Sequence, residues 1–251
     1  MAGNRVNSKR PAGRRASLKL SAQNPMVTDG VCHVEAERML PEEQPHGDTM
    51  QFRLTYEGPL HGSFNRDKRP EEKHAIRKKL HPQLRRLWEL TPHLKAMTHP
   101  PFEPVTVNAP SRISRIKFLA ENFSRLGGHF VPLVTEGLSL WCGLEVLFLR
   151  FGKPGKIYER GDIDNRMKTM LDALKMPDKQ EELGDHKFPD ADEDPFYCLL
   201  EDDGLISKLT VESDTLLEPL SGGIPSESDA RLVITVTLRP VVFNWGNMGF
   251  V

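Results

Sequence analysis

The chain has 251 residues, of which 38% are apolar, and a formal net charge of −1 at pH 7. This length fits one globular domain with flanking segments. The net charge by itself does not point to a polyanionic partner. The three cysteines form no C-x-x-C pair and no run of about 18 apolar residues occurs, which argues against a disulfide framework, a cysteine-built zinc site and a membrane span. We therefore expect a cytoplasmic protein with no membrane partner.

The N-terminal residues 1–49 show no hydrophobic periodicity, and residues 1–20 carry six basic side chains and no acidic one. A stretch of this composition buries too little apolar surface to fold alone. We predict a flexible, disordered basic arm over residues 1–49 and one folded domain over residues 50–251.

The first convincing strand begins at Met50, where apolar and polar residues alternate. A helix is expected over residues 67–90, because apolar residues recur there on one helical stripe, and Pro82 is expected to end or kink it near His81. Residues 66–95 hold ten basic and four acidic residues, which fits either a solvated helix face or a surface that faces phosphates.

The middle of the chain predicts one loop, one short helix and a strong strand. Residues 91–110 are rich in proline and indicate a loop, whereas residues 116–127 suit a short helix closed by Gly127. Residues 138–151 carry two alternating apolar sets, which predict a central strand covered on both faces. Two further strands are expected, at residues 204–213 and 230–242. Together with the helix described next, these elements predict an α+β domain with two main helices packed on a mixed β-sheet.

The stretch GDIDNRMKTMLDALK, residues 161–175, combines an amphipathic helical pattern with carboxylates at its start. Asp164 or Asn165 suits the N-cap of this helix, and Asp162 ends the extended segment before it. The carboxylates of Asp162 and Asp164 are therefore expected to meet at the junction, with Lys168 one turn beyond.

Two close carboxylates repel each other, and one is pushed toward protonation unless a cation binds between them. Mg²⁺ prefers oxygen ligands, and Asp202 or Asp203 offers a third carboxylate from a turn before the next strand. Such a site can activate water for attack on a phosphate, and Lys168 can stabilise the charge that develops. Ordinary helix capping and an ordinary turn are the alternative interpretation.

The acidic residues 176–197 are predicted to form a surface insertion. Residues 178–203 hold eleven acidic residues and two lysines, and this charge repels nucleic acid unless the segment folds away or acts as a regulatory flap. Residues 190–201 also place acids at positions 1, 3, 5 and 12 of a calcium loop. Pro195 stands where such a loop needs a glycine with positive φ, which argues against that alternative.

The segments RGDIDNRMKTMLDAL (160–174) and EDDGLI (201–206) resemble the signature of the RusA-like Holliday-junction resolvases. The similarity covers residues 139–175 and 199–239. It implies a RusA-like fold and a homodimeric, magnesium-dependent endonuclease that cuts four-way (Holliday) DNA junctions by paired phosphodiester hydrolysis in DNA recombination and repair. By motif position it implies the metal ligands Asp162, Asp164 and Asp203, with Asp202 less critical, and Lys168 as the catalytic lysine.

A sequence-neutral, salt-dependent phosphate surface accompanies this reading. Its expected DNA-binding residues are Arg66, Lys68, Arg69, Arg77, Lys78, Lys153, Lys156 and Arg160. Residues 1–49, 91–135 and 176–197 have no clear counterpart in the family, so the last two ranges are interpreted as insertions. Two other functions stay open: a branched nucleic-acid-binding protein without catalysis, and a nuclease of the same fold that acts on other DNA or on RNA.

Overall fold

The structure is a computed structural model that describes residues 49–62, 69–99, 112–151, 163–220 and 226–250. Apart from Thr49, the predicted arm lies outside these ranges. Across the described ranges the chain is α+β, with mixed sheets and four α-helices, which confirms the predicted fold class. None of the described helices is long and apolar enough to cross a bilayer.

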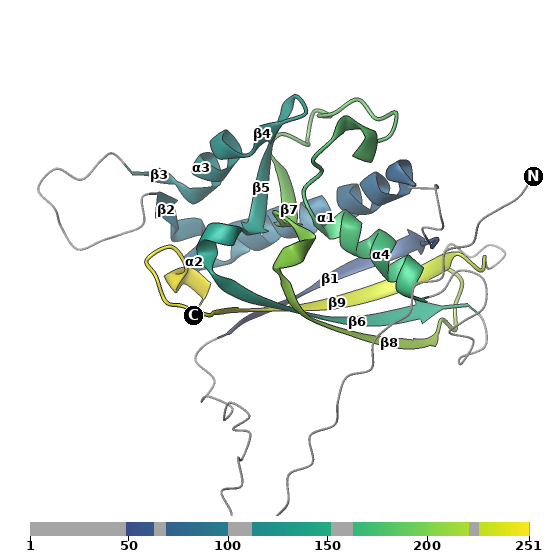
Figure 1. The fold of residues 1–251 in the computed structure, drawn as a ribbon. Coiled ribbons are helices and arrows are strands. Elements are labelled where there is room, and N and C mark those ends of the chain that lie inside the picture. Colours follow the sequence, from purple (N-terminus) through teal and green to yellow (C-terminus); the bar gives the residue numbers. More distant parts are fainter. Residues whose placement is uncertain (1–48, 63–68, 100–111, 152–162, 221–225, 251) are drawn as a thin grey trace, which may run out of the picture. The chain divides into compact units, whose positions relative to one another are not determined.

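The main sheet contains the strands that apolar alternation predicts, in the order β1-β9-β6-β8. Their bounds are Met50–Pro59 (β1), Asp229–Pro240 (β9), Leu140–Arg150 (β6) and Ile206–Thr215 (β8). β1 and β6 are antiparallel to β9, whereas β6 and β8 are parallel. A parallel pair needs a crossover connection, and the chain between these strands includes the helix α4 (Ile163–Leu174), which lies over the sheet in Figure 1.

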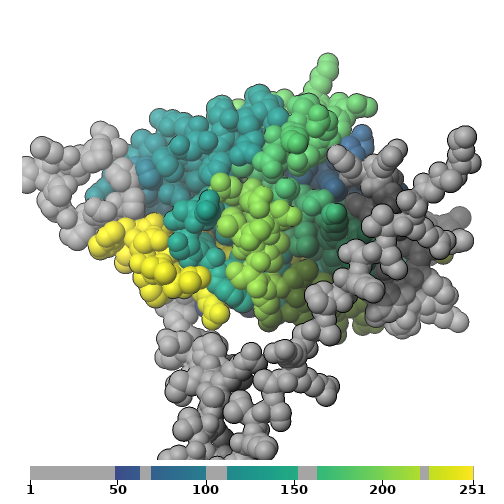
Figure 2. Space-filling view, in the orientation of Figure 1, coloured from purple at the N-terminus to yellow at the C-terminus, as the bar shows by residue number. Residues whose placement is uncertain are grey.

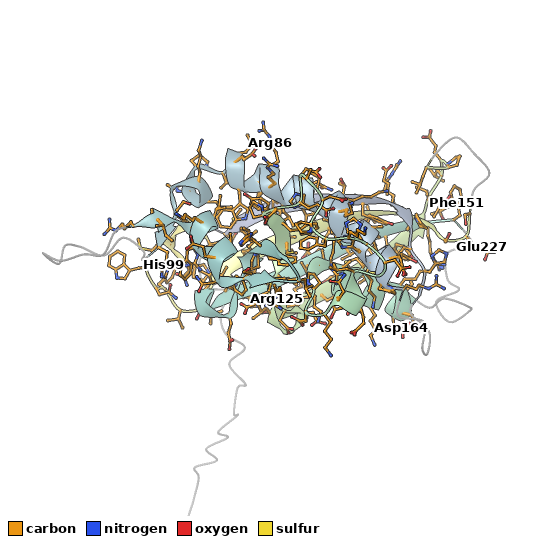
Figure 3. All side chains as sticks on the ribbon, turned by 90° about the horizontal axis from the view of Figure 1, so that it is seen from above. Arg86, His99, Arg125, Phe151, Asp164 and Glu227 are labelled. Carbon is orange, nitrogen blue, oxygen red and sulfur yellow. The ribbon has the colours of Figure 1, made fainter. Side chains whose placement is uncertain are left out.

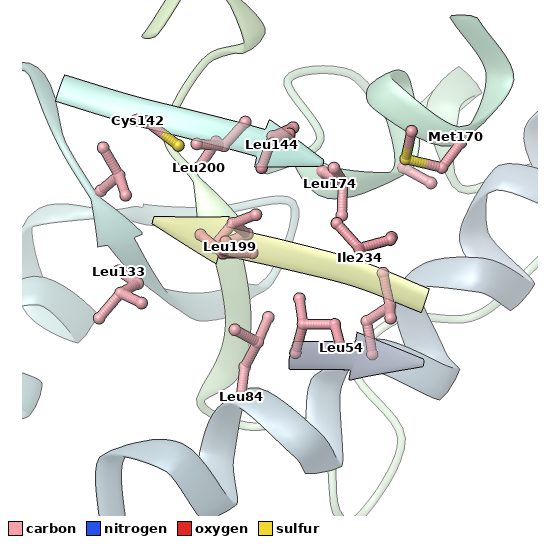
Figure 4. Packing of buried hydrophobic residues seen from close by; sticks show 14 of the residues in the cluster. Leu54, Leu84, Leu133, Cys142, Leu144, Met170, Leu174, Leu199, Leu200 and Ile234 are labelled. Carbon is pink, nitrogen blue, oxygen red and sulfur yellow. The ribbon is translucent and has the colours of Figure 1, made fainter. Parts of the chain in front are cut away.

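The main core lies between this sheet and the helices α4 and α1 (Pro70–Leu90). Figure 4 shows side chains from the sheet and from both helices in one cluster. Leu144 and Ile234 of the sheet, Leu84 of α1 and Leu174 of α4 are each at most 1% exposed. Burial of such a side chain contributes about 1.5–3 kcal/mol, so this cluster holds both helices on one face of the sheet.

α1 continues through Pro82, so of the two effects predicted for this residue the helix end does not occur. An internal proline costs about 3 kcal/mol, because it removes one backbone hydrogen bond and crowds the preceding turn. Leu80, Leu84 and Trp88 are buried on the same helix, and at about 1.5–3 kcal/mol each their burial outweighs that cost. Pro82 itself is exposed, where its ring displaces no core side chain.

The outer face of β6 is only partly covered, which corrects the prediction of a strand buried on both faces. One alternating set is buried: Leu140, Cys142, Leu144, Val146 and Phe148. On the other face Glu145 pairs with Lys208 at 3.0 Å, and the Arg239 guanidinium lies 4.4 Å from the Trp141 ring centroid. These polar partners let the second apolar set remain half-exposed.

The predicted insertion 91–135 forms small elements of its own. α2 (Pro92–Ala96) and β2 (Thr98–His99) occupy part of the stretch predicted as loop. β3 (Ile113–Ser114) pairs with β2 and leads into α3 (Arg115–Asn122). The rest of the predicted loop, residues 100–110, lies outside the described ranges.

Gly127 does not close α3, which ends at Asn122. It lies instead in the turn between β4 (Ser124–Arg125) and β5 (Gly128–Val134), where Leu126 has φ 55° and Gly127 has φ 84°. Two successive residues with positive φ are typical of a tight hairpin turn, and glycine adopts that conformation without strain.

A second sheet, in the order β4-β5-β7, was not predicted from the sequence. β7 (Phe196–Leu200) runs parallel to β5, and all five of its residues are buried. A turn at Asp203–Leu205 follows and leads directly into β8. The second sheet therefore delivers the acidic pair Asp202 and Asp203 to the start of a strand of the main sheet.

The last described residues form a surface segment after β9, coloured yellow in Figure 2. Val241, Phe243 and Trp245 expose between 45% and 66% of their surface, whereas Phe250 is 1% exposed. The buried Phe250 therefore packs the end of this segment against the core.

Candidate functional site

The start of α4 presents two predicted site residues to solvent. Asp164 and Lys168 are exposed, whereas Met167 and Met170 are buried against the sheet. The amphipathic pattern is therefore confirmed, and it turns the predicted catalytic side chains outward. Figure 3 shows Asp164 at the edge of the described residues, opposite Arg86 of α1.

The helix begins slightly earlier than predicted. α4 starts at Ile163, so Asp164 and Asn165 lie in its first turn and neither is the N-cap. Asp164 Oδ1 accepts a hydrogen bond from Asn165 N at 2.8 Å, and its second oxygen can still accept another partner. Asp162, the other half of the predicted carboxylate pair, lies outside the described residues.

The second acidic pair is positioned by the turn before β8. Asp202 Oδ1 accepts from Gly204 N at 2.8 Å, as a turn residue does. Asp203 Oδ1 lies 3.6 Å from Nζ of Lys175, the residue after α4. Partial burial opposes protonation of Lys175, but Asp203 and nearby carboxylates outweigh it and raise the pKa of Lys175.

The described structure does not show the predicted convergence of the aspartates on one ion. Asp164 lies in the first turn of α4, and Asp203 pairs with a lysine just beyond the end of that helix. The ten residue steps from Asp164 to Leu174 span about 15 Å at a rise of about 1.5 Å per residue. Among the described residues, no group of three potential metal ligands within 4.8 Å includes Asp164, Asp202 or Asp203.

A groove of about 340 Å³ adjoins the end of α4. Its described lining includes Lys73, whose Nζ lies 2.5 Å from Asp172 Oδ2, and Lys175. Three lysines and four carboxylates line the described part of this groove. Because its lysines are already matched by carboxylates, the groove does not offer a surplus of positive charge to a phosphate.

The predicted phosphate contacts divide into three groups. Five of them lie outside the described residues: Arg66, Lys68, Lys153, Lys156 and Arg160. Arg69 precedes α1, and its Nη1 lies 3.7 Å from Glu72 Oε2. Lys78 is partly exposed, but its Nζ lies 2.7 Å from Asp190 and 2.9 Å from Glu193, which raise its pKa by hydrogen bonding.

The prediction that Arg77 binds phosphate is wrong, because its side chain is 1% exposed. The guanidinium donates to the backbone carbonyls of Lys175 at 3.2 Å, Glu182 at 2.9 Å and Asp172 at 2.7 Å. It also pairs with the Glu182 carboxylate at 3.4 Å. Arg77 therefore fastens the end of α4 and the segment after it to α1.

The acidic insertion folds against basic groups of the domain. Arg125 pairs with Asp178, and His129 Nδ1 lies 2.9 Å from Asp194 Oδ1. Tyr197 N donates to His81 Nδ1 at 2.8 Å, so His81 Nε2 carries the proton and donates to the Asp192 carbonyl at 3.2 Å. Arg125 neutralises the charge of Asp178, and the two histidine contacts fix the rest of the segment to the domain.

The calcium-loop alternative finds no support in these contacts. Its acidic positions face separate partners: Asp190 contacts Lys78, Asp194 contacts His129, and Glu201 accepts from Glu136 N at 3.0 Å. A calcium ion needs its ligands around one centre.

Sequence reasoning missed a buried group formed by His74, His186 and Glu193. No short spacing links these residues, because His74 lies on α1 and the other two lie in the insertion. The available signal is the position of His74 on the buried side of α1, three residues before Arg77.

Comparisons of the chain with models of protein families, with curated proteins and with solved structures found no match. The functional assignment therefore rests on the residues of this chain.

Proposed function

We propose that the chain is a RusA-like, magnesium-dependent endonuclease that resolves four-way DNA junctions. The observation that carries the proposal is the outward display of Asp164 and Lys168, one turn apart, at the start of a helix whose opposite side is buried. These residues belong to the segment that resembles the resolvase signature. The α+β fold with its mixed sheet, and the helix between two parallel strands, are compatible with this family.

The exposed carboxylate of Asp164 suits Mg²⁺, a hard cation that is bound through one or two carboxylates and keeps several waters. Asp162, two residues earlier, is the expected second ligand. When bound, the ion supplies Lewis acidity and lowers the pKa of a coordinated water. Lys168 would neutralise the charge that develops on the phosphate. Asp203 contacts Lys175 beyond the far end of α4, so it would have to move toward Asp164 to take part.

A second candidate is a branched nucleic-acid-binding protein without catalysis. The contact between Asp203 and Lys175 favours it, because that contact engages the third expected carboxylate away from Asp164. Basic groups would still bind phosphates in such a protein, whereas hydrolysis would not occur.

A substrate panel tests the two proposals. We expect the purified full chain to introduce paired cuts in a labelled four-way junction with Mg²⁺, and to leave linear duplex and single strands intact. EDTA should abolish cleavage, because the carboxylates cannot activate water without the ion. Sedimentation of the protein–junction complex would test the predicted homodimer, since a two-fold dimer matches two cuts in opposite strands.

Each result of the panel decides between functions. Binding of the junction with no cutting in any divalent metal would favour the non-catalytic protein. Equal cutting of linear duplex, or cutting of RNA, would favour a nuclease of the same fold with another substrate.

The Lys168→Met variant is expected to reduce junction cleavage by about 10²–10³-fold, the usual effect of removing one group that stabilises transition-state charge. Junction binding should change little, because one exposed cation among many contributes weakly to phosphate binding. Single-turnover cleavage and gel-shift titration measure the two effects. Lys117→Met removes another exposed helical lysine as the control, and equal losses in both variants would contradict a catalytic role for Lys168.

A further inference from the structure

A compact group of ligating side chains connects α1 to the acidic insertion. His74 of α1, His186 and Glu193 each offer one nitrogen or oxygen, and these atoms lie within 4.8 Å of one another. His186 Nε2 lies 3.1 Å from Glu193 Oε2, and the ring centroids of His74 and His186 are 4.5 Å apart. Two ligands of a tetrahedral zinc ion with bonds of about 2.0–2.1 Å lie about 3.3 Å apart, so small side-chain shifts would complete this geometry.

His74 is the most informative member of the group. It is 3% exposed, yet neither Nδ1 nor Nε2 has a hydrogen-bond partner. A buried polar group without a partner costs about 1–3 kcal/mol, and most such groups in folded proteins have one. Burial first, and the neighbouring His186 and Arg77 second, lower the pKa of His74 to about 4. Both buried ring nitrogens of His74 are available to a metal ion.

Glu193 supplies a charged oxygen at the same place. It is 2% exposed, and burial alone would raise its pKa, but hydrogen bonds from Asp190 N, Lys78 and His186 lower it to about 2. Its Oε1 faces Lys78 at 2.9 Å, whereas Oε2 faces His186. One oxygen can therefore keep the lysine while the other binds an ion.

A hydrogen bond between His186 and Glu193 explains the position of those two side chains. It does not explain why both ring nitrogens of His74 are buried beside them without partners. Two imidazoles and one carboxylate are a ligand set that zinc uses, and imidazole nitrogen distinguishes this group from the carboxylate oxygens expected for Mg²⁺. We propose that His74, His186 and Glu193 bind a divalent transition-metal ion, with zinc the expected ion, and thereby fasten the acidic insertion to α1.

The fourth position of the site has a candidate within reach. Asp190 Oδ2 lies 3.5 Å from His186 Nε2, at the edge of the group, where it also contacts Lys78. The site is independent of the proposed nuclease centre, because its residues come from α1 and the insertion and include none of the motif aspartates.

Equilibrium dialysis of the metal-free full chain against Zn²⁺, with Mg²⁺ in excess, tests the proposal. We expect one zinc ion per chain, a rise in Tm on zinc addition, and the visible absorption of tetrahedral Co²⁺ when cobalt replaces zinc. His186→Gln and Glu193→Gln should each weaken zinc binding by about 100-fold or more, since even groups that only orient a ligand are worth 10–100-fold.

The control is His129→Gln, which breaks another contact between a histidine and a carboxylate on the same part of the fold and should bind zinc normally. His74→Phe keeps a ring in the core and should lose binding too. If His74→Phe does not fold, the partly exposed His186 still provides the test. A wild-type chain without tight zinc binding, or unchanged affinity in the His186 and Glu193 variants, would overturn the proposal.

Discussion

Replacing Asp164 with asparagine is expected to abolish junction cleavage while leaving junction binding intact or tighter. The amide keeps the shape of the side chain and an oxygen for the Asn165 backbone, but it loses the charge that holds a divalent cation. Loss of several kcal/mol of metal-assisted stabilisation corresponds to a fall of roughly 1,000-fold or more in rate. Single-turnover cleavage with Mg²⁺ measures the rate, and a gel-shift titration in EDTA measures binding.

The chain offers a close match for the control. Asp214 on β8 is also exposed, and its Oδ1 accepts from the next backbone nitrogen at 2.7 Å, as Asp164 does at 2.8 Å. Asp214→Asn should therefore reproduce any local structural effect and cut at the wild-type rate. Normal cleavage by Asp164→Asn would show that this carboxylate is no metal ligand.

Replacing Arg77 with methionine is expected to destabilise the fold by about 3–5 kcal/mol, the cost of breaking a buried charged network. Methionine fills a similar volume but leaves the carbonyl oxygens of Lys175, Glu182 and Asp172 without their donor. The Glu182 carboxylate also loses its cation. Urea denaturation followed by circular dichroism measures the free energy of unfolding.

Arg86→Met is the matched control, because Arg86 lies on the same helix with 65% of its side chain exposed. Its effect should stay within about 0.5 kcal/mol, as for most surface substitutions. A stable Arg77→Met protein that binds DNA poorly would restore the phosphate-binding role and contradict the structural one.

The sequence predicted the parts of the fold that have a clear period. β1, β6, β8, β9 and the two long helices follow apolar patterns, and burial of one face fixes each pattern. β5 and β7 lack such a signal. Most residues of β5 and all five residues of β7 are buried, so neither strand alternates between apolar and polar residues. β5 also contains Pro132, and proline in a sheet is typical of edge strands. Only the pairing of the two strands, distant in sequence, shows that they form a sheet.

Only part of the candidate site could likewise be predicted from the sequence. The spacing within one helix predicted that Asp164 and Lys168 share an exposed side, because both belong to a single periodic segment. The position of Asp203 depends on a turn and on Lys175, so the spacing of the motif could not supply it. The Arg77 error was avoidable, since Arg77 precedes Leu80 and Leu84 by three and seven residues and therefore lies on the buried stripe.

The polar stripe of α1 has a consequence for the size of the protein. His74, Arg77 and His81 recur at three- and four-residue steps, and each meets the stretch between α4 and β7. A shortened protein in which a simple loop replaces the stretch between α4 and β7 would expose these three polar side chains to solvent. The acidic insertion is therefore a structural part of the domain. Its removal would require apolar substitutions on the buried side of α1.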